Sequence, residues 1–279
     1  MDEVGFLVNN ITENGLLSLA TVGCIDANIL AGKSLVIKTK RGTIFGVVET
    51  PPIHLQSAEK RCENLQIKDI KLNIGCNSKK EAAEIVNLGA IVCFHANFNQ
   101  FGDNLLISKA LDDRIGCAIL IELLKTFTKF DFCAAFTTME ETGNSGVKAT
   151  LNRIKPDFAI VLESTTAADT PLTTPENTVC CLGHGPVISF MDKGTIYNRE
   201  MVDFAFSTAQ MAGLKIQYKR GISGTNDAKV IHTSRVKTLA VSVATRYSHS
   251  SASVASQEDI EQTFKLVKAI LERLCEGRI

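Results

Sequence analysis

The chain contains 279 residues, of which 45% are hydrophobic and 22% charged, a composition typical of a globular protein long enough for two domains. Its 30 basic residues balance 30 acidic ones, so we expect no nucleic-acid or membrane-surface partner. No apolar run approaches the roughly 20 residues of a membrane helix, and we expect neither a membrane span nor a signal peptide. Nine cysteines, none spaced C-x-x-C, indicate reduced thiols in a cytoplasmic protein.

Short strands and turns dominate the chain up to about Leu106. Residues Lys33–Thr39 and Thr43–Glu49 alternate between apolar and polar side chains on either side of Arg41-Gly42. This pattern predicts a β-hairpin.

One helix interrupts these strands. It is expected over Lys79–Leu88, with Ser78 as its N-cap, Glu81 completing a capping box and Gly89 as its C-cap. Strands return over Ala90–Asn97 and Asn104–Ser108. We therefore expect residues 7–106 to form a small β-rich domain.

After Leu106, apolar helices alternate with apolar strands, which predicts a sheet flanked by helices. The expected helices are Arg114–Phe127, Ser145–Arg153, Met201–Gly213 and Glu258–Cys275, the last with Ser256 as its cap. The expected strands are Phe132–Thr138, Phe158–Glu163, Val187–Phe190, Lys215–Tyr218 and Thr238–Ala244. The predicted fold class is therefore α/β, with residues 107–279 forming the main domain.

Two adjacent carboxylates, Glu140 and Glu141, follow the expected strand Phe132–Thr138 in A-F-T-T-M-E-E-T-G-N-S-G. Strand ends of this kind are where α/β proteins place their chemistry. Neighbouring side chains of an extended segment point to opposite sides, so we expect one glutamate to face a metal and the other a water or a substrate. A Glu-Glu pair alone is more often solvated surface, and the interpretation depends on further residues.

Three other positions supply those residues. Asp112-Asp113 lies where a helix begins, and helix capping alone explains acidic residues there better than metal binding does. Glu163 ends an apolar strand, where an exposed loop glutamate is an equally good interpretation of the local pattern. His249 follows the last strand, and a lone histidine is more often structural than a ligand. The other four histidines are assigned structural or surface positions.

Together, these residues bring carboxylates and an imidazole to the ends of separate strands of one sheet. Nitrogen and oxygen donors without thiolates suit zinc, cobalt or manganese. Two such cations, about 3.5–4 Å apart and sharing a carboxylate, form a two-metal hydrolase site. A further carboxylate then shuttles the proton to the leaving group.

Seven segments make the chain resemble the cocatalytic metallo-aminopeptidases, which include glutamyl, deblocking and tetrahedral aminopeptidases. They are M-D-E-V-G-F, K-A-L-D-D-R-I-G-C-A, T-T-M-E-E-T-G-N-S-G, V-L-E-S-T-T-A-A-D-T-P, L-G-H-G-P, S-G-T-N-D-A and R-Y-S-H-S, in the family's order. The resemblance implies a zinc-peptidase-like catalytic domain, residues 1–6 and 107–279, interrupted by the β-rich domain of residues 7–106. It also implies that the β-rich domain mediates self-association into dimers or dodecamers.

The resemblance implies an aminopeptidase that hydrolyses N-terminal residues of short peptides with two divalent metal ions, zinc first and cobalt or manganese as alternatives. Glu140 would be the general base and then the acid. Asp113 would orient its neighbour, and Asp2 would orient a metal-binding histidine through a hydrogen bond. The implied metal ligands are Asp112, Glu141, Glu163 and His249, with Asp112 bridging the two metals.

Two departures from the family pattern H-x-D-E affect these expectations. Met1 stands at the x, so the histidine would precede it, and the resemblance implies an N-terminally truncated catalytic domain. One metal site would then retain only Asp112 and Glu163. In addition, Glu163 stands where the family usually has aspartate.

Two alternatives to an active aminopeptidase follow. The first is a catalytically impaired or truncated relative that lacks one metal-binding histidine. The second is an endoglucanase, because relatives have carried that label and paired carboxylates can hydrolyse sugars. Adjacent glutamates that point apart, and a sequence without Trp, count against it. The residues that select the substrate stay unplaced, with Ser223–Asp227 and Gly183–Pro186 as candidates for lining its pocket.

Overall fold

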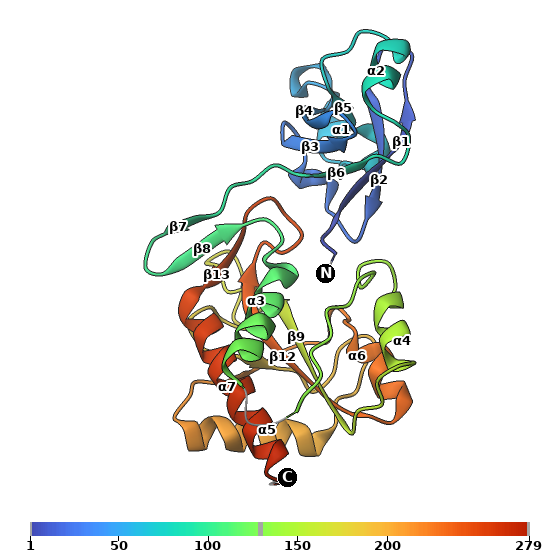
Figure 1. The fold of residues 1–279 in the computed structure, drawn as a ribbon. Helices are drawn as coiled ribbons and strands as arrows, with labels where there is room; N and C mark the ends of the chain where they lie inside the picture. Colours follow the sequence, from blue (N-terminus) through green and yellow to red (C-terminus); the bar gives the residue numbers. More distant parts are fainter. Residues whose placement is uncertain (1, 128–130, 278–279) are drawn as a thin grey trace. The chain divides into compact units, whose positions relative to one another are not determined.

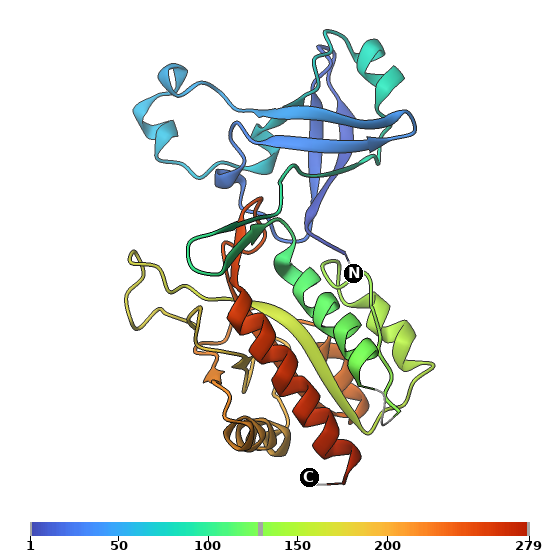
Figure 2. The same cartoon turned by 60° about the vertical axis from the view of Figure 1, so that its left-hand side comes forward.

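The computed structural model describes residues 2–127 and 131–277, which form two compact units (Figures 1 and 2). The sheet unit combines Asp2 with Phe98–Ser248 and with the chain from Ala252 onward. The barrel unit combines Glu3–Asn97 with His249–Ser251. Each unit has its own apolar core.

Six strands of the barrel unit close into a barrel in the order β1-β2-β5-β4-β3-β6. Their bounds are β1 Gly5–Ile11, β2 Leu17–Val22, β3 Ser34–Thr39, β4 Gly42–Glu49, β5 Lys71–Asn73 and β6 Ile91–Phe94. Alternate side chains point inward, and Phe6, Leu35 and Leu72 are fully buried in its centre. The predicted hairpin is confirmed as β3 and β4, which pair antiparallel from Ser34 opposite Val47 to Thr39 opposite Gly42.

Short helices connect these strands. They are α1 Ala58–Arg61, α2 Lys79–Ile85 and the 3₁₀ turns Ala27–Ile29, Ile53–Leu55 and Ile67–Asp69. The Ser78 hydroxyl accepts a hydrogen bond from the Glu81 amide, so the predicted N-cap of α2 is confirmed. The predicted end of this helix was wrong. It stops at Ile85, because the next residue, Val86, is extended and buried in the barrel core rather than continuing toward Gly89.

The described residues of the sheet unit form a seven-stranded sheet, in the order β11-β10-β12-β13-β8-β7, with β9 also paired to β12. Their bounds are β7 Asn99–Phe101, β8 Leu105–Ser108, β9 Phe158–Thr166, β10 Val187–Ile188, β11 Gln217–Tyr218, β12 Lys237–Arg246 and β13 Ser253–Ser256. β9 pairs with β12 in parallel along the whole of β9, from Phe158 opposite Lys237 to Thr166 opposite Thr245. Eight consecutive residues of β12 are buried, as expected for a central strand covered on both faces.

Helices pack against this sheet and complete the predicted α/β fold (Figure 2). They are α3 Leu111–Thr126, α4 Ser145–Leu151, α5 Arg199–Ala212, α6 Ala228–Ile231 and α7 Gln257–Cys275, with a 3₁₀ turn at His232–Ser234. The predicted cap of α7 is confirmed, since the Ser256 hydroxyl accepts a hydrogen bond from the Asp259 amide. No helix among the described residues combines the length and apolar character that crossing a membrane requires.

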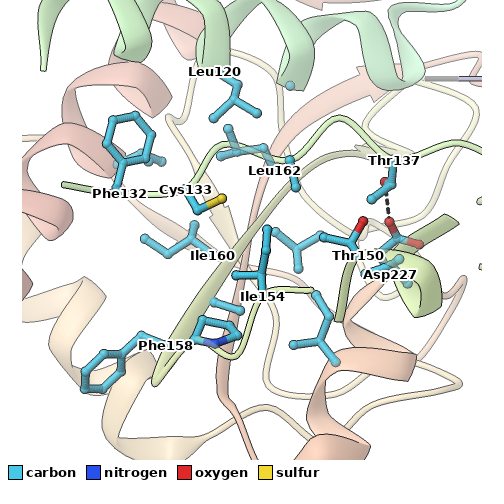
Figure 3. Close-up of a pocket in the computed structure, with 18 of the residues that line it drawn as sticks. Leu120, Phe132, Cys133, Thr137, Thr150, Ile154, Phe158, Ile160, Leu162 and Asp227 are labelled. Atoms are coloured by element: carbon cyan, nitrogen blue, oxygen red, sulfur yellow. Dashed lines mark hydrogen bonds between the residues drawn. The ribbon is translucent and has the colours of Figure 1, made fainter. Parts of the chain in front are cut away.

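The predicted strand Phe132–Thr138 was wrong. This segment belongs to no strand ladder, and within the described chain β9 pairs with β12 alone. A cavity of about 600 Å³ lies between α3, the segment and β9, lined by apolar side chains that include Leu120, Phe132, Ile160 and Leu162 (Figure 3). Apolar sequence favours extension, but a strand also requires a neighbour for its backbone hydrogen bonds.

Candidate metal centre

Asp112 and Asp113 occupy an irregular first turn of α3. Their backbone angles are not helical, and a cis peptide bond joins them. Asp113 is 5% exposed, and its Oδ1 accepts a hydrogen bond from the Gly116 amide at 3.0 Å. A Cβ at Gly116 would lie 2.4 Å from the Asp113 carboxylate, so a glycine permits this close approach. The capping interpretation therefore fits Asp113.

Glu163 extends from β9 toward these aspartates and is 9% exposed. Carboxylate oxygens of Asp112, Asp113 and Glu163 all lie within 4.8 Å of one another. Burial, followed by repulsion from the two aspartates, raises the pKa of Glu163 well above its usual value. Burial and the Asp112 charge likewise raise the pKa of Asp113. A bound divalent cation would offset this repulsion, so these carboxylates fit a metal.

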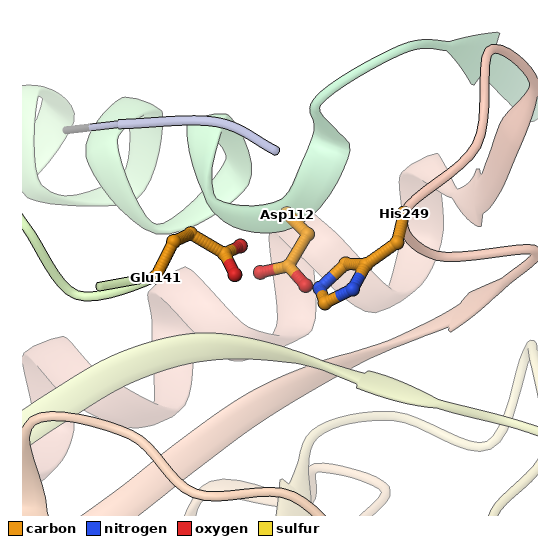
Figure 4. Close-up of side chains that lie close together, drawn as sticks. All are labelled: Asp112, Glu141 and His249. Atoms are coloured by element: carbon orange, nitrogen blue, oxygen red, sulfur yellow. The ribbon is translucent and has the colours of Figure 1, made fainter. Parts of the chain in front are cut away.

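A second group combines Asp112, Glu141 and His249 (Figure 4). Its ligand atoms also lie within 4.8 Å of one another. The His249 Nδ1 lies 2.7 Å from the Cys24 carbonyl oxygen, which can only accept a hydrogen bond. In the tautomer that this contact requires, Nε2 carries the lone pair that metal ligation needs.

Asp112 therefore belongs to both groups. Its carboxylate lies within 4.8 Å of a ligand atom of Glu163 and, in the second group, of Glu141 and His249. Carboxylates and one imidazole without thiolates match the donors that zinc, cobalt and manganese accept. The structure thus brings together the residues that the sequence suggested as ligands.

Glu140 lies beside these groups without belonging to either of them. Its backbone amide donates to the Asp2 carboxylate at 3.3 Å, and its Oε1 accepts from the Asn144 side-chain amide at 3.3 Å. Burial raises the pKa of Glu140 to about 7, and the Glu141 and Asp112 carboxylates contribute in the same direction. A carboxylate with such a pKa accepts and returns protons efficiently near neutral pH.

The turn after Glu140 determines where both glutamates lie. The Ser145 amide donates to the Met139 carbonyl at 3.2 Å, and the Gly146 amide donates to the Thr138 carbonyl at 3.0 Å. A Cβ at Gly146 would lie 2.0 Å from that Thr138 oxygen. The glycine-rich sequence is therefore a packing requirement of the turn.

Two polar residues at this centre were missed as individual site residues. Asn144 is 3% exposed and Asp227 is 6% exposed, and their side chains are hydrogen-bonded to each other. Asn144 appeared in the sequence only as part of a turn, and Asp227 only as part of the candidate lining Ser223–Asp227. No sequence pattern indicated that these two residues meet, because 83 positions separate them.

Comparison with protein families places the chain among known peptidases. A family model described as M42 glutamyl aminopeptidase matches residues 1–266. An aminopeptidase-named protein of Acetivibrio thermocellus is 32% identical over 279 residues, covering 99% of this chain and 80% of the relative. The lysyl aminopeptidase of Pyrococcus furiosus is 30% identical, covering 98% of this chain and 80% of the relative.

Solved structures give the same result. A TET aminopeptidase from a marine sediment archaeon, Thaumarchaeota archaeon SCGC AB-539-E09, superposes with a TM-score of 0.92 and 29% identity, covering 100% of this chain and 81% of that chain. A Thermotoga maritima structure named as an endoglucanase superposes with a TM-score of 0.74 and 29% identity, covering 99% of this chain and 78% of that chain. That name agrees with neither the family match nor the aminopeptidase relatives, so it gives no support to sugar hydrolysis.

Proposed function

We propose that this chain removes N-terminal residues from short peptides, with Glu140 as its general base. The proposal proceeds from its family, since the chain belongs to the M42 glutamyl aminopeptidases and is a metal-dependent aminopeptidase. The observation that carries this proposal is the shared position of Asp112 between two groups of metal-ligating side chains. A carboxylate between two such groups is the arrangement that a two-metal hydrolase needs.

Asp112, Glu141 and His249 would hold one divalent ion, and Asp112 with Glu163 would hold the other, with zinc as the proposed metal. Asp113 would orient its neighbour Asp112, and its own carboxylate accepts a hydrogen bond from the Gly116 amide. The orientation of a metal-binding histidine by Asp2 stays a prediction, and in this chain the Asp2 carboxylate accepts a hydrogen bond from the Glu140 amide. When bound, the two cations supply Lewis acidity, which acidifies water and polarises the scissile carbonyl.

Glu140 has the position and the proton affinity for the remaining chemistry. It stands next to the proposed ligand Glu141 but belongs to neither ligand group, and we propose that its second carboxylate oxygen, Oε2, faces the attacking water. It accepts the proton of the attacking water and then donates it to the leaving amine. Burial raises the pKa of this carboxyl group, which makes it a better proton acceptor near neutral pH.

Replacing Glu140 with glutamine tests this role. We expect Glu140→Gln to lose at least about 100-fold in kcat on an aminoacyl-anilide while its metal content stays unchanged, because glutamine cannot accept a proton. The exposed Glu122→Gln on α3 is a matched control and should retain full activity. Unchanged turnover by Glu140→Gln would refute the assignment.

Metal stoichiometry distinguishes an active enzyme from a catalytically impaired relative. We expect two zinc ions per chain by elemental analysis of protein purified without chelator. One ion or none, together with absent peptidase activity, would favour the impaired relative.

Self-association is the second part of the proposal. Solved Pyrococcus horikoshii TET1 relatives form dodecamers, tetrahedra or octahedral shells. We propose that the β-rich residues 7–106 mediate assembly of this chain, while residues 107–279 carry catalysis. Apolar side chains on the outer barrel surface support this, since Phe45 is 58% exposed and Ile91 is 57% exposed. Phe45→Glu should reduce the mass measured by light scattering, and an unchanged mass would refute the role of this surface.

A further inference from the structure

Asn144 and Asp227 are two buried polar residues beside Glu140 to which the proposed mechanism gives no role. Asn144 lies in the turn after Glu141, in the left-handed backbone region at φ 58° and ψ 34°. Asp227 directly precedes α6, but its carboxylate does not cap that helix. Buried polar side chains are costly unless their hydrogen bonds are made, so the partners of these two residues are informative.

One amide connects the two carboxylates. The Asn144 Nδ2 donates to the Asp227 Oδ1 at 3.1 Å and to the Glu140 Oε1 at 3.3 Å. The other Asp227 oxygen, Oδ2, accepts the hydroxyl of Thr137 at 2.5 Å (Figure 3). Because ionised carboxylates only accept hydrogen bonds, the nitrogen of the Asn144 amide must be the end that faces them. Asp227 therefore holds this amide in one orientation.

We propose that Asn144 and Asp227 are positioning residues for Glu140. Asp227 holds the Asn144 amide, and Asn144 holds the Glu140 carboxylate through Oε1, which directs Oε2 toward the water. This inference rests on the proposed role of Glu140 as the base.

The surrounding charges explain why such an anchor is needed. The Glu141, Asp112 and Asp227 carboxylates all act unfavourably on the Glu140 charge. A long side chain among like charges would turn away from them unless a donor held it. The Asn144 amide is an uncharged donor, so it holds the Glu140 carboxylate without placing a second positive charge beside the proposed metal ions.

Asn144→Gly separates positioning from a purely structural role. Glycine adopts the left-handed backbone without cost, so this variant keeps the turn and removes only the amide. We expect kcat to fall about 10–100-fold, with KM within about twofold of the wild type and metal content unchanged. Retention of the wild-type kcat would show that Asn144 serves the turn alone and would overturn the proposal.

Asp227 offers an independent test. Asp227→Asn keeps an oxygen that can accept from Asn144, whereas Asp227→Ala removes it. We therefore expect Asp227→Asn to retain most of the kcat and Asp227→Ala to lose about as much as Asn144→Gly. Equal and full activity of both variants would overturn the role of Asp227.

A double-mutant cycle tests whether Asn144 acts through Glu140. Aspartate at position 140 is one methylene shorter and lies beyond the reach of the Asn144 amide. In the Glu140→Asp background, Asn144→Gly should change kcat less than about twofold, because coupled residues are not additive. A further loss of about 10–100-fold would contradict the proposal. Full activity of Glu140→Gln would instead refute the proposed function itself.

Discussion

Gly146 gives a prediction in which two physical effects oppose each other. It lies inside α4, where alanine is normally about 0.5–1 kcal/mol more favourable than glycine. Here the added Cβ would lie 2.0 Å from the Thr138 oxygen and 2.6 Å from the Thr138 nitrogen. These are backbone atoms, so no side-chain rotation relieves the contact. The oxygen must move from 2.0 Å to at least 3.0 Å, a shift of about 1 Å.

We expect the clash to win over helix propensity in Gly146→Ala. Overpacking of this kind costs about 1–3 kcal/mol, which exceeds the propensity gain. The larger effect is on catalysis, since Thr138 lies two residues before Glu140 and a misplacement of about 1 Å can cost about 100-fold in rate. Urea unfolding and the kcat for an aminoacyl-anilide measure the two effects. Ser145→Ala, in the same turn, is the control. A kcat for Gly146→Ala within twofold of the wild type would refute the reasoning.

Three further predictions concern charge and packing. Burial raises the pKa of Asp169, but hydrogen bonds from the Arg246 side chain and the Leu182 amide outweigh burial and lower that pKa. The ionised Asp169 therefore stabilises the folded protein above the usual carboxyl pKa, and this stabilisation is lost as the pH falls through the lowered value. Asp169→Asn should therefore reduce the free energy of unfolding more at pH 7 than at pH 3, and an equal loss at both would contradict this. Leu123→Ala should cost about 2–5 kcal/mol in urea unfolding, because Leu123 is 1% exposed in the core, and a loss below 1 kcal/mol would be inconsistent with that packing. With chelator at pH 8, Glu163→Gln should have a higher melting temperature than the wild type, because burial and the nearby aspartates penalise the Glu163 charge. With added zinc, the wild type should have the higher melting temperature. A variant that still melts at the higher temperature in zinc would count against Glu163 as a ligand.

Local sequence patterns correctly predicted those structural elements whose stabilising contacts come from residues close by in the chain. The hairpin of β3 and β4 closes on itself, and the start of α7 is stabilised by Ser256 three residues before the amide that it caps. Both depend on interactions over a few positions, so the pattern of a short window contains the necessary information.

The sequence also predicted the candidate ligands, but from several positions and ordered segments taken together rather than from any single local pattern. Asp112 alone looked like a capping residue, and His249 alone looked structural. Their combination at the ends of separate strands suggested a metal centre, and the ordered set of segments supported it. The structure brings Asp112 close to Glu141, Glu163 and His249.

By itself, the sequence determined the alternation of helices and strands, the β-rich character of the first hundred residues and the residue types available for metal binding. The tertiary structure alone decided that residues 132–138 pair with no strand of the described chain and that Asn144 meets Asp227 across 83 positions. It also decided that Glu140 is buried beside other carboxylates, which raises its pKa. Backbone pairing and burial of charge depend on groups that are distant in the chain, and folding brings those groups together through contacts that no local window contains.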